Sequence, residues 1–148
     1  MTIVSDSDVD NEVYALLVEA GQRYTGGRRR LVAALQSGDG PLTITQLLAA
    51  DETLSQSSAY RNLTILEEVG AVTRVMAHGD FARYELAESI TGHHHHLICT
   101  QCGDVTDFSL DTPTERSLEG ALHRAAEPSG FDVRAHRLDL LGVCHDCT

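Results

Sequence analysis

No stretch of the sequence approaches the roughly 18 consecutive apolar residues that a membrane-spanning helix needs. The N-terminal segment, Ser5 to Glu12, is acidic, whereas a secretory signal joins a basic start to an apolar segment. Lysine is also absent, so all 11 basic residues are arginines, and the 22 acidic residues give a net charge of −11. These absences predict a soluble, cytoplasmic protein that does not enter a membrane and keeps its cysteines reduced.

The shortage of positive charge argues at first against a nucleic-acid partner, because affinity for a polyanion depends on cationic side chains that release counterions. The distribution of charge matters more than the sum. Residues 21–34 hold four arginines and no acidic residue, and Arg61 adds a fifth. A basic surface on the first half is therefore compatible with an acidic protein, although a merely solvated arginine-rich face is the alternative.

Cysteine occurs only as two Cys-X-X-Cys pairs, Cys99 with Cys102 and Cys144 with Cys147. Two such pairs form a tetrahedral thiolate site that suits zinc. Two disulfides are the alternative, but a reducing compartment disfavours them. The spacing therefore predicts a structural Zn²⁺ site.

The first half shows the periodicity of a helix-turn-helix followed by a hairpin. Apolar spacing and helix stops predict four helices and two strands, over residues 9–21, 28–36, 43–48, 57–70, 72–75 and 82–86. The strands flank a turn at His78-Gly79-Asp80, which makes a wing. The fourth helix presents side chains that can meet base edges and phosphates, namely Ser57, Ser58, Tyr60, Arg61 and Thr64.

Four consecutive histidines, His93 to His96, stand just ahead of the apolar Leu97-Ile98-Cys99. Successive side chains of an extended segment point to opposite faces, so His93 and His95 should face one way and His94 and His96 the other. Such an arrangement serves two ions better than one. Further ligands must come from a helix expected over residues 114–126 or a strand expected over 133–143.

The stretch from Ser57 to Leu63, the wing strand ending Arg83-Tyr84-Glu85-Leu86, and the histidine run leading into Cys-X-X-Cys resemble the ferric uptake regulator family of metal-dependent repressors. The resemblance implies that Tyr60 and Arg61 read bases and that Arg28 contacts the DNA backbone. It also implies two metal sites. One is a dimerisation-domain site with His93, His95, Glu119 and His136, where Glu119 is preferred to Glu115 for its spacing to Gly130-Phe131 and His136; the other is a regulatory site with Glu85, His94 and His96.

The fourth regulatory ligand departs from the family pattern. Pro41 stands where iron-responsive members place a histidine, and Ala87 stands where many zinc-responsive members place a cysteine. His78, Asp80 or water are the candidates to complete the site. The regulatory ion is accordingly open between Zn²⁺ and Fe²⁺ or Mn²⁺, with zinc favoured by the affinity order.

The combined expectation is an α+β homodimer. Residues 1–87 form a winged helix-turn-helix DNA-binding domain with a mobile acidic tail over 1–10, residues 88–92 form a hinge, and residues 93–148 form a small α/β dimerisation domain with the four-cysteine zinc site. The expected function is zinc-uptake-regulator-like repression at a palindromic A·T-rich operator of double-stranded DNA, with metal as corepressor. An iron-responsive or a manganese- or peroxide-sensing repressor is the alternative within the family. A zinc-dependent hydrolase is the alternative of another class, against which the sequence shows no His-Glu-X-X-His motif.

Overall fold

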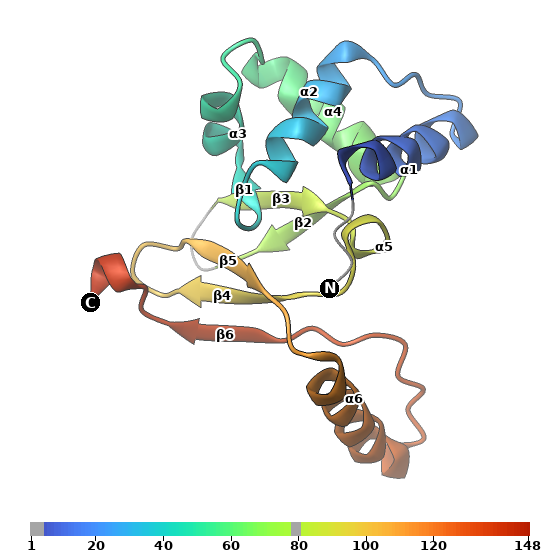
Figure 1. Ribbon diagram of the computed structural model, residues 1–148, viewed down its shortest axis with the longest axis vertical. Helices are drawn as coiled ribbons and strands as arrows, with labels where there is room; N and C mark the ends of the chain where they lie inside the picture. The colour runs from blue at the N-terminus through green and yellow to red at the C-terminus, as the bar shows by residue number, and fades with distance from the viewer. Residues whose placement is uncertain (1–4, 78–80) are drawn as a thin grey trace.

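The computed structural model describes residues 5–77 and 81–148, and its first domain is the expected winged helix (Figure 1). Four helices, α1 (Asp6–Glu19), α2 (Gly26–Gln36), α3 (Ile44–Ala50) and α4 (Gln56–Glu68), pack with a three-stranded antiparallel sheet. The sheet has the order β1 (Leu42–Thr43), β3 (Ala82–Leu86), β2 (Val72–Met76). The turn at 78–80, where the wing tip was expected, lies outside the described residues.

Side chains at the helix starts explain where the helices begin. Ser5 and Thr43 each form a capping box, accepting from the amides of Asp8 and Gln46, and Thr25 caps α2. Such caps typically contribute about 1 kcal/mol each because they satisfy backbone donors at the first turn. Residues 6–10, which were expected to belong to an acidic tail, form the first turns of α1 after the cap at Ser5.

The core of this domain is a cluster of aliphatic side chains from all four helices. Leu17, Leu31, Leu47, Leu63 and Leu66 are at most 1% exposed. Burying each one contributes roughly 1.5–3 kcal/mol. The predicted amphipathic faces therefore meet as the periodicity indicated, and they hold α4 in place on α2 and α3.

The segment expected as a hinge is largely structured. A short helix, α5 (Glu88–Thr91), follows β3 and contacts α1. Its Ile90 is 6% exposed and belongs to the same core as the helices above. α5 thus packs with the helical core of the first domain, and Gly92, which follows it, has a φ of 92° that favours glycine.

The second domain is a three-stranded sheet with one long helix. The strand order is β5 (Val105–Phe108), β4 (His95–Cys99), β6 (Asp139–Gly142), with β4 antiparallel to β5 and parallel to β6. The helix α6 (Thr112–Ala126) begins at the cap Asp111 and is followed by two 3₁₀ turns, η1 (Glu127–Ser129) and, at the C-terminal end, η2 (His145–Cys147). The expected strand over 133–143 is corrected to four residues, because only the part alongside β4 finds a pairing partner.

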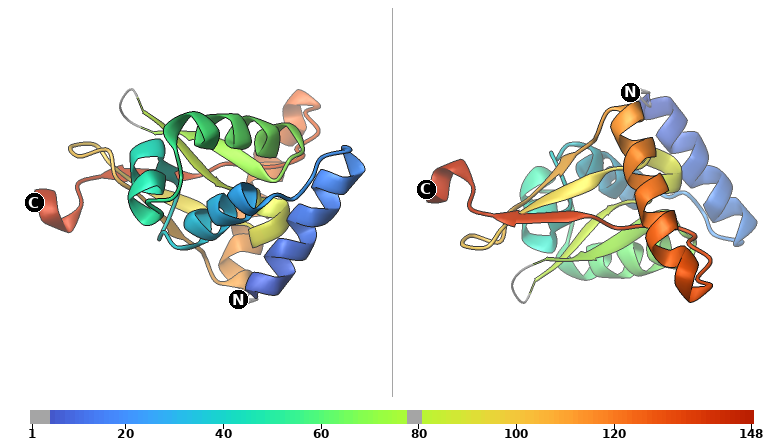
Figure 2. Two further views of the ribbon diagram at one scale, coloured as in Figure 1. Left: turned by 90° about the horizontal axis from the view of Figure 1, so that it is seen from above. Right: turned by 90° about the horizontal axis from the view of Figure 1, so that it is seen from below.

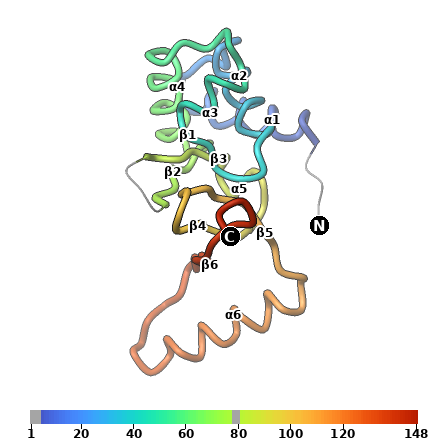
Figure 3. The backbone as a smooth tube through the Cα atoms, turned by 90° about the vertical axis from the view of Figure 1, so that its left-hand side faces the viewer, coloured from blue at the N-terminus to red at the C-terminus, as the bar shows by residue number. Residues whose placement is uncertain are grey.

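Helix α6 stands away from the rest of the protein (Figures 1 and 3). None of its residues is buried within this single chain. In the right-hand view of Figure 2, seen from below, α6 lies in front of the sheet and the winged domain lies behind it. Among the described residues, no helix combines the length and apolar character needed to cross a membrane.

Candidate metal centres and nucleic-acid interface

The four cysteines gather where the turn after β4 meets the end of the chain after β6. The sulfurs of Cys99, Cys102, Cys144 and Cys147 all lie within 4.8 Å of one another. Cys102 Sγ and Cys144 Sγ are 3.7 Å apart, which matches the roughly 3.8 Å between sulfurs around a tetrahedral zinc with Zn–S bonds of about 2.3 Å. The predicted four-cysteine cluster is confirmed, and its geometry fits Zn²⁺.

The pKa values of the cysteine thiols also favour a bound cation. Hydrogen bonds from the backbone amides of Cys102 and Cys144 lower the pKa of Cys99 to about 6. Hydrogen bonds with the thiols of Cys144 and Cys102 raise the pKa of Cys147 to about 12. Adjacent sulfurs resist carrying negative charge together, and zinc relieves that conflict by accepting all four as thiolates.

A second cluster lies where the two domains meet, and we call it the hinge site. It comprises Glu85 on β3, His94 just before β4, His96 on β4 and Asp107 on β5. Glu85 Oε2 lies 3.0 Å from His94 Nε2 and 3.1 Å from His96 Nε2. Asp107 Oδ1 lies 3.8 Å from His94 Nε2 and 3.6 Å from His96 Nε2. Four donor atoms from both domains therefore face one point.

The other ring nitrogen of each hinge histidine is already engaged. His94 Nδ1 lies 3.1 Å from the carbonyl oxygen of Gly92, and His96 Nδ1 lies 3.2 Å from Asp139 Oδ1. Because both of these oxygens accept, each Nδ1 donates and each Nε2 is left to bind an ion. The surroundings thus orient both imidazoles as metal ligands.

The hinge site holds mixed charge in the absence of an ion. Burial raises the pKa of Glu85, but hydrogen bonds from His94 and His96 outweigh it and hold that pKa at about 2. The same hydrogen bond to Glu85 raises the pKa of His94 to about 9 and also raises that of His96. Burial raises the pKa of Asp107. Protons on the imidazoles therefore occupy the place that a cation would take.

The third cluster lies at the start of α6, and we call it the α6 site. Its members are His93, His95, Glu115 and His136. Glu115 Oε2 lies 2.8 Å from His95 Nε2, and Glu115 Oε1 lies 3.0 Å from His136 Nε2. That Oε1 nevertheless has no hydrogen bond of acceptable geometry, and His93 Nε2 faces His136 Nε2 at 3.1 Å. Lone pairs that converge without pairing with one another are the arrangement expected around a cation.

The α6 site corrects one predicted ligand. Glu115, and not Glu119, joins the three histidines. Helix α6 begins at Thr112 because Asp111 caps it, so Glu115 lies in the first turn beside the sheet, and Glu119 lies one turn further along and is exposed. Three features of the sequence indicate this helix start, namely the cap Asp111, its partner Thr114 and the proline between them.

The alternation of the histidine run is confirmed. His93 and His95 belong to the α6 site, whereas His94 and His96 belong to the hinge site. Two expected contributors to the hinge site, His78 and Asp80, lie outside the described residues. Asp107 is the ligand candidate that the sequence did not suggest. The sequence feature that could have indicated Asp107 is the turn at Gly103, because it folds the following strand back on β4 and places Asp107 opposite His96.

The exposed face of α4 carries the side chains expected to read DNA. Ser57, Tyr60 and Arg61 are exposed, and Tyr60 is 45% exposed despite its aromatic ring. Ser58 is half-buried and accepts from the Asn62 amide, and the Thr64 hydroxyl donates to the carbonyl oxygen of Tyr60. A groove of about 510 Å³ runs beside Tyr60, between α3, α4 and the wing strands; it is lined by Thr43, Ile44, Thr45, Arg74, Phe81, Ala82 and Tyr84.

Arg28 lies beneath this face. Its side chain is buried, at 8% exposure. The guanidinium donates from Nε to Asn62 Oδ1 at 3.1 Å and from Nη1 to the carbonyl oxygen of Arg23. Arg28 therefore connects the loop before α2 to α4, and its expected contact with the DNA backbone stays a prediction.

Comparison with known proteins agrees with this geometry. The model of the ferric uptake regulator family matches residues 19–141. The chain belongs to the ferric uptake regulator family. Similar members include the peroxide-responsive repressor PerR of Staphylococcus aureus, 31% identical over 140 residues that cover 92% of this chain and 89% of PerR.

Solved structures of the ferric uptake regulator family share the fold. The ferric uptake regulator Fur of Helicobacter pylori superimposes with a TM-score of 0.77 over 99% of this chain and 97% of its own, at 20% identity. A zinc-bound manganese uptake regulator has a TM-score of 0.66 over 89% of this chain and 98% of its own, at 29% identity. An N-terminal winged helix followed by a dimerisation domain is thus the architecture of this family member.

Proposed function

We propose that this protein is a metal-dependent transcriptional repressor in which a divalent cation at the hinge site acts as corepressor. The observation that carries the proposal is the convergence of Glu85, from the winged domain, with His94, His96 and Asp107, from the second domain. A cation bound there supplies the positive charge that holds two carboxylates together. The four side chains then restrain the winged domain relative to the dimerisation domain, which selects orientations able to bind DNA.

Zn²⁺ is our first candidate for the hinge ion. Two imidazoles and two carboxylates provide four ligands, and zinc binds such mixed sites more tightly than iron or manganese when all are equally available. The same donor set supports a second candidate. Carboxylate oxygens suit Mn²⁺ and Fe²⁺, and the similarity to the peroxide-responsive repressor PerR favours a repressor that responds to manganese, iron or peroxide.

The donor count favours regulation over hydrolysis. Catalytic zinc sites combine three protein ligands with a position for water. The hinge site and the α6 site each present four protein donors. Together with membership of a regulator family, this makes the hydrolase alternative the weaker proposal.

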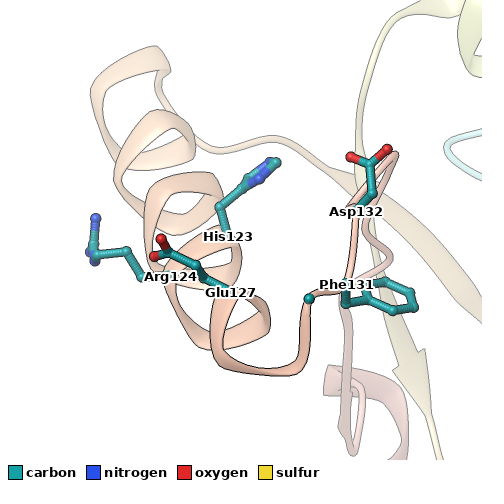
Figure 4. A pocket seen from close by; sticks show the side chains of 6 residues that line it. His123, Arg124, Glu127, Phe131 and Asp132 are labelled. Carbon is teal, nitrogen blue, oxygen red and sulfur yellow. The ribbon is translucent and has the colours of Figure 1, made fainter.

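We further propose a homodimer formed through the second domain. Exposed apolar side chains gather there, namely Leu97, Leu122, Phe131, Leu140, Leu141 and Val143. A cleft of about 380 Å³ lies between α6 and the loop after it. In Figure 4, His123 is directed toward that loop and Phe131 points away from the helix. A second copy of the chain covering this face would set two α4 helices on successive turns of a palindromic, A·T-rich operator.

The four cysteines and the domain boundary have structural roles in this proposal. Bound Zn²⁺ at the cysteines contributes to the folding of the second domain, because small domains with tetrathiolate zinc depend on their metal. We place the change of domain at Gly92, after α5. We also propose a cytoplasmic location, which reduced thiols and a DNA partner would favour.

The test is operator binding as a function of hinge metal. Duplexes selected from a randomised palindromic pool would be titrated with protein that retains cysteine-bound zinc, with and without Zn²⁺, Mn²⁺ or Fe²⁺. We expect at least tenfold tighter binding with the correct ion. The double change His94→Ala and His96→Ala should abolish the response, whereas Glu19→Ala, at the exposed end of α1, should not. Equal affinity with and without hinge metal would contradict the proposal.

A further inference from the structure

The winged domain touches the second domain at a place other than the hinge ligands. The turn between α2 and β1, residues 38–41, lies against the outer edge of β5. The backbone amide of Asp107 donates to the carbonyl oxygen of Asp39 at 2.9 Å. β5 is an edge strand of its sheet, so this hydrogen bond occupies a position that would otherwise be an unpaired strand edge.

The approach at Gly40 is too close for any side chain. A Cβ added there would lie 2.5 Å from the carbonyl oxygen of Val105 and 3.2 Å from the amide nitrogen of Asp107. These are backbone atoms, which cannot rotate away. Gly40 does not have a positive φ. Glycine is therefore required at this position by the contact with β5 and not by its own backbone conformation.

A buried arginine supports the same contact from the winged domain. Arg83 on β3 is 8% exposed. Its Nη1 donates to the carbonyl oxygen of Pro41 and to Gln46 Oε1, both at 3.2 Å, and lies 3.7 Å from Asp104 Oδ1, just before β5. One guanidinium thus connects the turn and α3 to the second domain.

The contact also reaches the hinge site. Asp107 uses its backbone amide for the turn and its carboxylate for the cluster with His94 and His96. In the antiparallel pairing, Asp107 lies opposite His96. An amide that points away from β4 makes this a non-hydrogen-bonded pair, in which side chains approach most closely.

We propose that the turn at Asp39-Gly40 is a docking contact that couples occupancy of the hinge site to the position of the DNA-reading helices. Asp107 is a positioning residue in this contact as well as a ligand. Residues 38–41 lead directly into β1 and α3, so a displacement of Asp107 is passed to the helix-turn-helix through the backbone. The inference rests on the proposed function, since the output is operator binding.

The test is Gly40→Ala, whose added methyl group must separate the turn from β5. The first readout is amide hydrogen exchange at Asp107, measured by NMR on the full protein with cysteine-bound zinc in place. We expect faster exchange at that amide with the ladder between β4 and β5 still protected. The second readout is Zn²⁺ affinity at the hinge site, and the third is operator affinity; both should weaken by roughly five- to tenfold, the order expected for one lost hydrogen bond with displacement of backbone.

Two variants serve as controls. Gly26→Ala introduces the same methyl group at the start of α2, where its nearest neighbour is the Arg30 side chain at 3.8 Å. Asp39→Ala removes a carboxylate but keeps the carbonyl oxygen that accepts from Asp107. Both should keep slow exchange at Asp107. Cysteine-bound zinc content and the thermal unfolding midpoint verify that Gly40→Ala folds.

The outcomes are distinguishable. Unchanged exchange at Asp107 in Gly40→Ala would overturn the docking contact, and faster exchange with unchanged Zn²⁺ and operator affinity would overturn the coupling. If the wild-type protein does not bind DNA in response to metal, the proposed function fails. The coupling between the turn and the hinge site is then tested by amide exchange at Asp107 and by Zn²⁺ affinity, which need no DNA.

Discussion

Metal binding at the hinge site should release protons from its two histidines. In the metal-free protein, the hydrogen bond to Glu85 raises the pKa of His94 to about 9 and also raises that of His96. Both imidazoles use Nε2 for this hydrogen bond, which is the atom that an ion needs. Protons must therefore leave before the ligands can bind.

The size of the effect follows from these pKa values. At pH 7, two units below the value for His94, nearly one proton leaves that residue for each ion bound. Zn²⁺ affinity should then rise about tenfold between pH 7 and 8 from His94, and up to about a hundredfold if His96 also releases a full proton. Glu85, with a pKa of about 2, contributes nothing in this range. The dependence due to His94 should flatten above its pKa of about 9.

The stability of the metal-free protein should change with pH in the opposite direction from Zn²⁺ affinity. A pKa raised in the folded protein stabilises the metal-free structure fully below the unfolded value of about 6.5. This contribution is lost as the pH rises through the folded value of about 9 for His94. Alkaline conditions should therefore loosen the contact between the domains in the metal-free protein while they favour metal binding.

Isothermal titration calorimetry in buffers of different ionisation enthalpy counts the protons directly. The protein should retain cysteine-bound zinc and have an empty hinge site. Glu85→Gln removes the carboxylate whose hydrogen bonds raise both imidazole pKa values, so proton release at pH 7 should fall below that of the wild-type protein. An enthalpy that does not depend on the buffer, together with a constant affinity between pH 7 and 8, would refute the reasoning.

Two further predictions concern Glu115 and Arg28. Glu115→Gln should weaken metal binding at the α6 site at least tenfold in equilibrium dialysis. Glu119→Gln should leave it unchanged, because Glu115 and not Glu119 lies among the histidines. Equal effects of the two changes would contradict this ligand set. Arg28→Ala should lower the free energy of unfolding by about 1–3 kcal/mol, since it leaves Asn62 and the carbonyl oxygen of Arg23 without their donor. Denaturant unfolding measures this change, and Arg61→Ala, at an exposed position, is the control. An unchanged stability of Arg28→Ala would contradict the prediction.

Features with a fixed local period could be predicted from the sequence. The two-residue period of a strand divided the histidine run correctly between two clusters. The expected helix start at residue 43 and helix end at residue 70 agree with the cap at Thr43 and the positive φ of Gly70, which reflect local preferences that need no tertiary contact. The spacing within each Cys-X-X-Cys pair likewise brings two sulfurs together without reference to the rest of the fold.

Features that depend on register between distant segments could not be predicted in this way. Asp107 joins the hinge site because β5 pairs with β4 from a particular residue onward. Glu115 replaces Glu119 because α6 begins at Thr112, and a difference of one turn moves a side chain by about 5 Å along a helix. The burial of Arg28 depends on Asn62, 34 residues away, and no local pattern reports that partner.

The composition of the hinge site explains why the turn at Asp39-Gly40 matters for a chain with Pro41 at the place where a ligand histidine was expected. The side chain of proline offers no donor atom to an ion, and three of the four described members of the hinge site come from the second domain. Among the described residues, Glu85 is the one member of the hinge site that comes from the winged domain. A single attachment leaves the domain free to rotate about that point, so metal at Glu85 would restrain its distance more than its orientation. The hydrogen bond from Asp107 to Asp39 adds a second point on the same domain, and two points reduce the remaining freedom to rotation about one axis. The backbone of this turn thus provides the restraint that a side-chain ligand at position 41 would have supplied.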